Sequence, residues 1–279
     1  MTICVGMLCR DGVVLAADTQ ESYGENKSYV AKIFPVGSAH GNTIVAGAGL
    51  ASFIDYAKEK IRTIRPGEAA TPDEFEAKVR RLMRGFYAEE FKLYPCEDSL
   101  KQIELLIAVQ LRKEFPFLLH VDCDLVKRVR DARAIGAGMF TPMATDFFSM
   151  NLLTTQAVWA CMYIVKEAKL RYEGIGGSTQ IVALTSEGFQ VERTWDIPQR
   201  EQVLGRIDGL ARRLLISLVP ATADGMLNAS LQSAADLLRV TRKDLQKFDK
   251  QFARALKVNE AMGERSRKRI SKVAFKEDS

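Results

Sequence analysis

The sequence predicts an α+β fold in which two β-sheets pack face to face and helices cover both outer faces. Strand-like and helix-like segments follow one another in blocks: strands, two helices, strands, helices and strands again. The chain has 279 residues, 47% of them hydrophobic, and can therefore bury a large core. After Trp195 helical periodicity replaces strand alternation, which predicts a C-terminal helical extension.

The N-terminal segment is predicted to form a β-hairpin. Apolar residues alternate with small or polar ones over residues 3–7, and Asp11-Gly12 supplies a tight turn. The segment Val13–Ala17 then forms a buried return strand. This hairpin brings Asp18, at the end of the return strand, back towards Thr2.

The later elements follow from periodicity and from helix-start signals. Further strands are predicted at 29–36, 43–46, 103–111, 117–122, 126–134, 179–184 and 189–191, with a polar loop at 20–28. A first helix is predicted from Ala51. A second starts at Thr71, an N-cap residue followed by Pro72, and runs to about Tyr94. Residues 141–170 are predicted to be helical in two pieces.

The chain is predicted to have three parts. These are a domain over residues 1–195, a helical extension over 196–262 and a basic, disordered tail over 263–279. The extension carries leucines at helical spacing on both sides of Pro220. Either an interaction module or an additional packed helical hairpin fits this pattern.

Composition argues against several classes of protein. A formal net charge of +5 is too small to indicate nucleic-acid binding, and no apolar run is long enough to cross a bilayer. The N-terminus has no basic stretch followed by an apolar one, which is the pattern expected of a signal peptide. Five scattered cysteines fit reduced thiols, and two histidines argue against a histidine triad or a multi-histidine metal centre. We therefore expect a cytoplasmic protein with no membrane or nucleic-acid partner and no metal or cofactor.

Thr2 is a candidate nucleophile. If Met1 is removed, a free α-amine lies on the same residue as a hydroxyl group, and threonine is small enough for this trimming. An amine with a pKa of about 8 can accept the hydroxyl proton near neutral pH. A small polar residue at the second position of an ordinary chain is the alternative interpretation. Cys4 would need an additional cut to play the same part.

The segment over residues 11–19, Asp-Gly-Val-Val-Leu-Ala-Ala-Asp-Thr, follows Thr2 and a short strand. This arrangement resembles the start of a proteasome β subunit and of the related bacterial ATP-dependent threonine peptidase, which are N-terminal nucleophile (Ntn) hydrolases. The resemblance extends from Thr2 to about Val191. It implies the four-layer α-β-β-α sandwich of that family, with Thr2 as nucleophile.

Three further residues acquire roles from this resemblance. Asp18 matches the family's structural aspartate, which would hold Lys32 in place. Lys32, in an otherwise apolar strand, would lower the pKa of the Thr2 amine by like-charge repulsion. Gly47 would present its N–H to the oxyanion of the reaction. The alternatives are a turn acid at 18, an edge-strand lysine at 32 and a packing glycine at 47.

Three positions depart from the family pattern. Ala137, in the segment Ile135-Gly136-Ala137-Gly138, replaces a serine whose hydroxyl and N–H touch the threonine amine; only the N–H is kept. Glu173 stands where the family has an aspartate paired with arginine, and Gly176 takes the place of a serine.

The resemblance implies a threonine-type peptidase or amidohydrolase that acts on peptides or proteins inside the cell. It also implies a homo-oligomeric ring and a possible ATPase or regulatory partner. Two alternatives remain open. One is a non-catalytic proteasome-like scaffold subunit, and the other is an Ntn amidohydrolase that acts on small molecules.

Overall fold

The computed structural model describes residues 1–23, 26–38, 41–64, 71–90, 102–111, 114–191, 197–217, 228–229, 231–244 and 246–247. The Cα positions divide the chain into two compact units, Met1–Glu201 and Gln202–Ser279. The division at residue 195 and the limits of the helical extension stay predictions, and the predicted tail lies outside the described residues.

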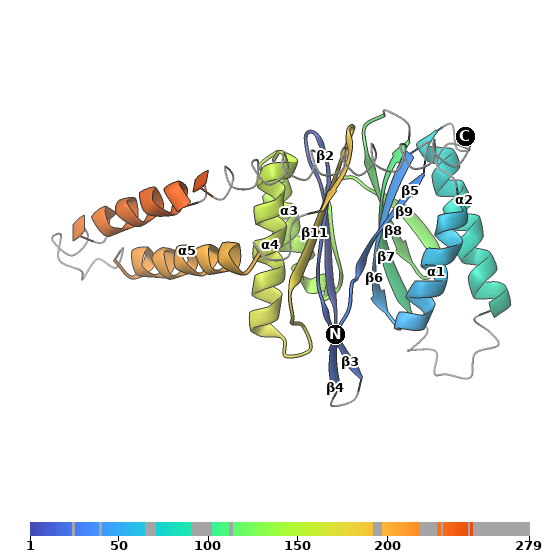
Figure 1. Ribbon diagram of the computed structural model, residues 1–279, viewed down its shortest axis with the longest axis horizontal. Helices are drawn as coiled ribbons and strands as arrows, with labels where there is room; N and C mark the ends of the chain where they lie inside the picture. The colour runs from blue at the N-terminus through green and yellow to red at the C-terminus, as the bar shows by residue number, and fades with distance from the viewer. Residues whose placement is uncertain are drawn as a thin grey trace, which may run out of the picture. The chain divides into compact units, whose positions relative to one another are not determined.

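The first unit contains two five-stranded sheets in which neighbouring strands are antiparallel (Figure 1). The first sheet has the order β10 (Ala132–Gly136), β1 (Ile3–Leu8), β2 (Gly12–Asp18), β11 (Thr179–Thr185) and β12 (Gly188–Val191). The second has the order β5 (Ile33–Ser38), β6 (Gly41–Gly49), β7 (Ile103–Leu111), β8 (Phe117–Asp122) and β9 (Leu125–Val129).

The two sheets pack against each other through one continuous apolar layer. Leu15 of β2 belongs to the same buried cluster as Ile44 of β6, Leu106 of β7 and Leu118 of β8. The cluster contains alternate residues of single strands, namely residues 13, 15 and 17 of β2 and residues 44, 46 and 48 of β6, so one face of each sheet is turned inwards. The predicted packing of sheet on sheet is thus present in the first unit.

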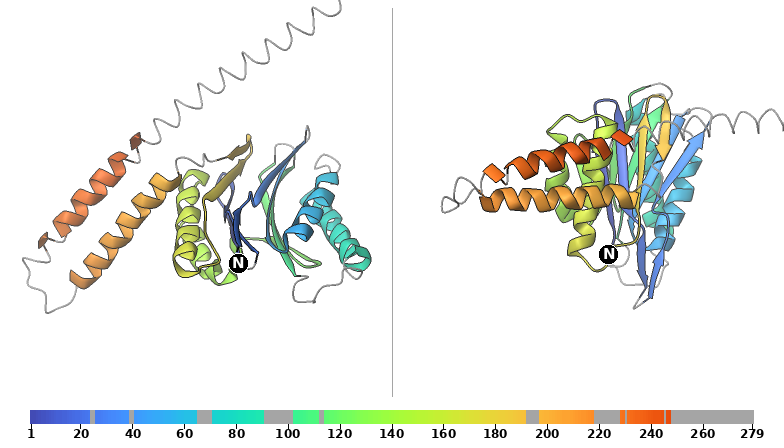
Figure 2. Two further views of the ribbon diagram at one scale, coloured as in Figure 1. Left: turned by 60° about the horizontal axis from the view of Figure 1, so that its bottom comes forward. Right: turned by 60° about the vertical axis from the view of Figure 1, so that its left-hand side comes forward.

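Helices cover the outer faces of both sheets (Figures 1 and 2). The helices α1 (Ala51–Thr63) and α2 (Pro72–Gly85) pack on the second sheet, where Phe53, Phe75 and Val79 join Leu105 and Ile107 in a separate cluster. The helices α3 (Thr141–Phe148) and α4 (Thr154–Arg171) lie against the first sheet. The α+β class predicted from the sequence is therefore confirmed.

The predicted start of α2 is confirmed at atomic detail. The Thr71 side chain accepts a hydrogen bond from the Glu74 N–H at 3.2 Å, and Pro72 occupies the first turn. The helix continues as a short π-helix over Phe86–Glu90. Its predicted end near Tyr94 lies outside the described residues.

Two predictions about strands are wrong. Residues 20–28 are not a loop, because β3 (Gln20–Tyr23) and β4 (Asn26–Tyr29) form a two-stranded ribbon, and the next strand starts only at Ile33. The single strand predicted over 126–134 is two strands, β9 and β10, which belong to different sheets. Alternation of side chains continues across such a crossover, so periodicity alone does not mark it.

The C-terminal part of the chain contains α5 (Ile197–Ser217) and further helical residues at 228–229, 231–244 and 246–247. Their helical state agrees with the periodicity of the sequence there. No helix in the described part of the chain is both long and apolar enough to cross a membrane.

Candidate active site

Lys32 connects the predicted nucleophile to the predicted aspartate. Its Nζ donates to Thr2 Oγ1 and to Asp18 Oδ1, both at 2.9 Å, and to the backbone oxygen of Gln20. An ammonium group has three protons, so these three acceptors use all of them. Since Thr2 Oγ1 accepts a hydrogen bond from Lys32, the proton of the Thr2 hydroxyl group points away from Lys32 Nζ. Lys32, just before β5, and Asp18, at the end of β2, are thus held together next to Thr2.

Asp18 is fully buried at the end of β2, and each carboxylate oxygen has two hydrogen-bond donors. Oδ1 accepts from the Ile3 N–H at 3.0 Å in addition to Lys32, and Oδ2 accepts from the N–H groups of Gln20 and Gly176, both at 3.2 Å. Four donors compensate for the loss of solvent around the charge. The carboxylate therefore joins β1, the ribbon and the glycine turn before β11.

Gly47 lies in the buried part of β6 and lines a cavity beside Thr2. A Cβ atom at this position would lie 2.6 Å from Ile54 Cγ2 of α1, so the close approach of the helix requires glycine. Its carbonyl oxygen accepts a hydrogen bond from Cys4 Sγ at 3.5 Å. These contacts demonstrate a packing role, and the oxyanion role of its N–H stays a prediction.

Ala137 also lies beside Thr2, although its contact differs from the expected one. Its N–H donates to the carbonyl oxygen of Thr2 at 2.9 Å, whereas the sequence led us to expect a contact with the amine. Antiparallel pairing of β1 with β10 explains the difference, because Ile3 lies opposite Gly136 and the ladder continues to the next residue. Gly136 has φ +72°, and a Cβ there would lie 2.3 Å from Thr2 O.

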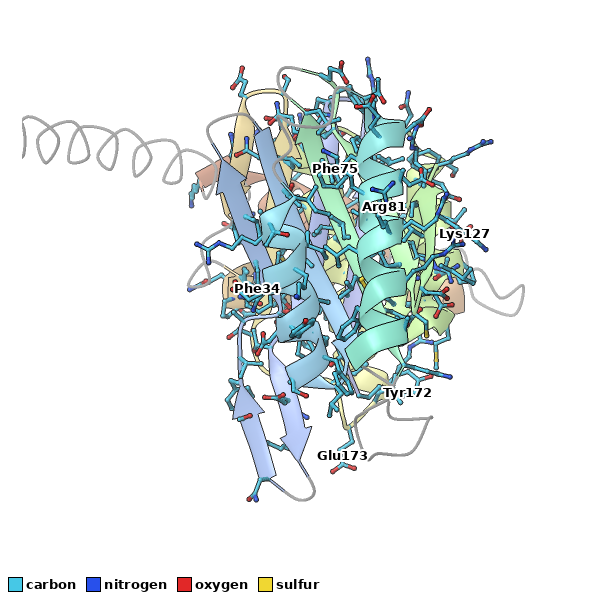
Figure 3. The ribbon with its side chains drawn as sticks, turned by 90° about the vertical axis from the view of Figure 1, so that its right-hand side faces the viewer. Phe34, Phe75, Arg81, Lys127, Tyr172 and Glu173 are labelled. Atoms are coloured by element: carbon cyan, nitrogen blue, oxygen red, sulfur yellow. The ribbon has the colours of Figure 1, made fainter. Side chains whose placement is uncertain are left out.

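The side chain of Glu173 does not lie near Thr2, the predicted nucleophile. Its side chain is exposed, and Figure 3 shows it pointing away from the sheets. No described residue bonds to its carboxylate, while its backbone oxygen accepts from Gln20 Nε2 at 3.2 Å. The turn that follows offers the Gly176 N–H to Asp18 instead of an acidic side chain.

Sequence reasoning missed two residues, Glu104 and His120. Glu104 Oε2 accepts the Gly136 N–H at 2.8 Å, and Oε1 lies 3.3 Å from His120 Nε2. The hydrogen bond to His120 and that from Gly136 lower the pKa of Glu104, against the opposing effect of burial. The one available signal was a charged residue near the start of the apolar strand Ile103–Leu111.

Cys4 is excluded as an ionised nucleophile by its surroundings. The side chain is fully buried next to Lys32 and Asp18, and burial raises the pKa of its thiol to about 12. The thiol is therefore protonated near neutral pH, and it lacks the exposure that reactive cysteines have.

A cavity of about 880 Å³ opens beside Thr2. Its lining comes from the N-terminus, the ribbon, β5, β6, α1 and the turn after β10, and comprises Met1, Thr2, Glu21, Val30, Ala31, Lys32, Phe34, Gly47, Ala48, Gly49, Leu50, Ala51, Ile54, Asp55 and Gly136. This volume is in the range of ligand-binding clefts. A hydroxyl group, an ammonium group and a backbone glycine thus face one apolar space.

Met1 precedes Thr2 and lines the same cavity. Its side chain is 60% exposed, and its backbone nitrogen would lie 3.0 Å from a Cβ placed on Gly174. Removal of this residue would leave the α-amine of Thr2 beside the same cavity. The site could then supply nucleophile and base from a single residue.

A family model and several solved structures match this chain. Residues 2–182 match the family model of the proteasome subunit. A comparison with curated protein sequences finds no match.

Similar solved structures include "Anbu (ancestral beta-subunit)" from Yersinia bercovieri, with 15% identity, a TM-score of 0.64 and coverage of 79% of this chain and 99% of that one. Anbu from Hyphomicrobium sp. strain MC1 has 14% identity, a TM-score of 0.64 and the same coverage. The "Helical Assembly of the Anbu Complex" from Pseudomonas aeruginosa has 15% identity and a TM-score of 0.61, over 80% of this chain and 99% of that one.

At these identities the solved structures establish a shared fold, and the family model covers well over half of the chain. The chain therefore belongs to the proteasome subunit family.

Proposed function

We propose that the protein is a threonine-type peptidase of the cytoplasm, in which Thr2 becomes the N-terminal nucleophile after removal of Met1. The observation that carries this proposal is the contact of Thr2 Oγ1 with the buried Lys32–Asp18 pair. The proposed fold that holds this site is the four-layer α-β-β-α sandwich, followed by a helical extension. The proposed substrates are peptides or proteins.

The proposed reaction has two steps. Thr2 Oγ attacks the carbonyl carbon of the substrate, and the Thr2 α-amine takes the hydroxyl proton directly or through a water molecule. The Gly47 N–H stabilises the oxyanion, after which the C–N bond breaks and the leaving amine receives that proton. A water molecule then hydrolyses the acyl-enzyme ester, so that Thr2 is restored and the acid product leaves.

Lys32 acts through charge and position. Its ammonium group is held by Asp18 and contacts Thr2 Oγ1, so that after removal of Met1 its charge would favour the neutral, proton-accepting form of the α-amine on the same residue. Since Lys32 already donates to Thr2 Oγ1, it also stabilises the oxygen as negative charge develops during attack.

A homo-oligomer is part of the proposal. The structurally similar protein from Pseudomonas aeruginosa is described as a helical assembly. Confinement of the Thr2 cavity inside an assembly would protect other proteins from cleavage. An ATPase or another regulatory partner that delivers unfolded substrates would suit such confinement.

The proposal is tested by intact-mass spectrometry of the purified native protein before and after incubation with a threonine-directed epoxyketone. We expect loss of Met1 and one covalent adduct on the wild-type chain, and no adduct on folded Thr2→Ala. Retention of Met1, or no adduct on a correctly trimmed chain, would contradict the proposal.

A non-catalytic scaffold subunit is the second candidate. Ala137 lacks a hydroxyl group beside Thr2, and the Glu173 carboxylate points away from the site. A trimmed protein that assembles but neither forms the adduct nor hydrolyses peptides would favour this function. Hydrolysis of small amides without hydrolysis of peptides would instead indicate a small-molecule amidohydrolase.

A further inference from the structure

The cavity beside Thr2 carries three charged side chains, and two of them already have a partner of opposite charge. Lys32 is paired with Asp18 at 2.9 Å, and Asp55 is paired with Lys58 at 2.7 Å. The third is Glu21 of the ribbon. Its carboxylate accepts a weak hydrogen bond from Ser28 Oγ at 3.4 Å, and no cation of the described residues lies within ion-pair distance of it. Among the charged side chains of the cavity, Glu21 is therefore the one without an ion-pair partner in the described part of the chain.

The remaining walls of the cavity are mostly apolar. Val30, Phe34, Leu50 and Ile54 contribute aliphatic and aromatic surface. Phe34 lies beside α1, above the base of the ribbon, where Figure 3 labels it. Lys58 Nζ covers one face of the Phe34 ring at 3.4 Å from its centroid, and its charge is balanced by Asp55.

Resting on the proposed function, we propose that this cavity binds the side chain next to the attacked carbonyl and selects lysine or arginine through Glu21. Thr2 and Gly47 both line the cavity, so the acyl side of a substrate bound at Thr2 lies against it. A lysine or arginine side chain combines a hydrocarbon stem, which suits the apolar wall, with a cationic end for the carboxylate. An acidic side chain would be repelled by Glu21, and a neutral one would leave Glu21 without a counter-charge.

The preference is tested with fluorogenic peptides that differ only in the residue before the cleaved amide: lysine, arginine, norleucine or glutamate. Norleucine keeps the hydrocarbon stem of lysine without its charge. We expect kcat/KM for the lysine peptide to exceed that for the norleucine peptide by about tenfold, as one charge-assisted contact gives. The glutamate peptide should be the poorest substrate. Raising the salt concentration should reduce the lysine preference, because the carboxylate is half-exposed.

Glu21→Gln is the decisive variant, since it keeps the size of the side chain and removes the charge. We expect it to bring the lysine-to-norleucine ratio of kcat/KM close to one, because the lysine peptide loses its charged partner. Asp55→Asn is the matched control, because Asp55 lines the same cavity but is paired with Lys58. A wild-type preference for norleucine, or a ratio that survives Glu21→Gln, would overturn the inference.

A binding measurement separates this inference from the proposed function. If no peptide is hydrolysed and no adduct forms, the peptidase proposal fails, and the affinities of the lysine and norleucine peptides for the Thr2→Ala chain still report on the cavity. Tighter binding of the lysine peptide that is lost in Thr2→Ala combined with Glu21→Gln would support the subsite. Equal affinities would refute it, whatever the activity of Thr2.

Discussion

Lys32 Nζ lies 2.9 Å from Thr2 Oγ1 and the same distance from Asp18 Oδ1, so one ammonium group binds both the hydroxyl of Thr2, the proposed nucleophile, and the buried carboxylate of Asp18. Only 7% of Lys32 and none of Asp18 is exposed. Charges this deeply buried stabilise a fold only as a pair, because removal of one partner leaves the other without solvent or counter-charge. The stability of the fold and the chemistry of Thr2 therefore depend on the same contact.

Lys32→Met should destabilise the protein and abolish the reactivity of Thr2 towards the epoxyketone. The substitution keeps the apolar stem but leaves Asp18 charged and buried, which costs about 3–5 kcal/mol in the free energy of unfolding. Urea unfolding measures that loss, and the rate of epoxyketone adduct formation measures the loss of reactivity. Lys27→Met, on the exposed strand β4, is the control and should change neither quantity. An unchanged unfolding midpoint for Lys32→Met would refute the pairing.

Gly136→Ala should displace Thr2 from its position. The backbone there has φ +72°, and the added Cβ would lie 2.3 Å from Thr2 O. Strain of this kind costs about 1–3 kcal/mol, and any relief requires movement of the first strand. Gly138→Ala is a closely matched control, since no heavy atom lies within 4 Å of its added Cβ. We expect slower adduct formation and a lower melting temperature for the first variant alone; equal behaviour of the two would contradict this account.

Glu104 should hold the turn that carries Gly136 and Ala137. Glu104→Ala removes the acceptor of the Gly136 N–H, whereas Glu104→Gln keeps an oxygen in its place. We therefore expect faster hydrogen exchange over residues 134–138 in the alanine variant and partial rescue in the glutamine variant. Equal exchange rates in the wild type and both variants would show that the Glu104 side chain does not stabilise this turn.

Glu104 should also make stability depend on pH. Its pKa is lowered in the folded state by His120 and Gly136, so its stabilising effect is present above the unfolded-state pKa of about 4.3. The effect is lost as the pH falls below that value and through the folded-state pKa. The difference in unfolding free energy between wild type and Glu104→Gln should therefore be constant at neutral pH and shrink below about pH 4.3. A difference that persists at lower pH would have another origin.

Much of the fold could be predicted because strand alternation and helix caps are local signals. The hairpin that returns Asp18 to Thr2 is confirmed, with Cys4 opposite Ala17, and so is the cap at Thr71. The crossover at residues 130–131 was missed, because leaving one sheet for another changes no local pattern. The ribbon was missed because its residues are mostly polar, and polar strands resemble loops.

The candidate site was predictable only where it lies close to the N-terminus or resembles a known motif. Lys32 was singled out because a lone lysine stands in an otherwise apolar segment that was predicted to be a strand and matches the motif; the structure starts that strand at Ile33. Glu104 of β7 contacts Gly136 at the end of β10, and His120 of β8 contacts Glu104; no spacing in the sequence relates these residues to one another. Glu173 was placed by motif alone, and the direction of its side chain depends on the turn that holds it.

Gly47 permits a test that separates packing from chemistry. Gly47→Ala should destabilise the protein, because its Cβ would lie 2.6 Å from Ile54 Cγ2 and 3.1 Å from Leu105 Cδ2. Ile54→Ala removes the first of these obstacles at the cost of a smaller core. The double variant should therefore be more stable than the sum of the single effects predicts, by about 1–2 kcal/mol in urea unfolding.

The same double variant reports on the oxyanion. Alanine keeps the backbone N–H at position 47. If glycine is needed there only to make room for Ile54, reactivity towards the epoxyketone should return together with stability in the double variant. Ile54→Ala alone is the reference, because Ile54 also lines the cavity. Additive losses of stability would mean that Ile54 does not limit the space at Gly47. If stability is restored but reactivity is not, a side chain at position 47 would block the substrate, and glycine would be needed there to let the substrate come close.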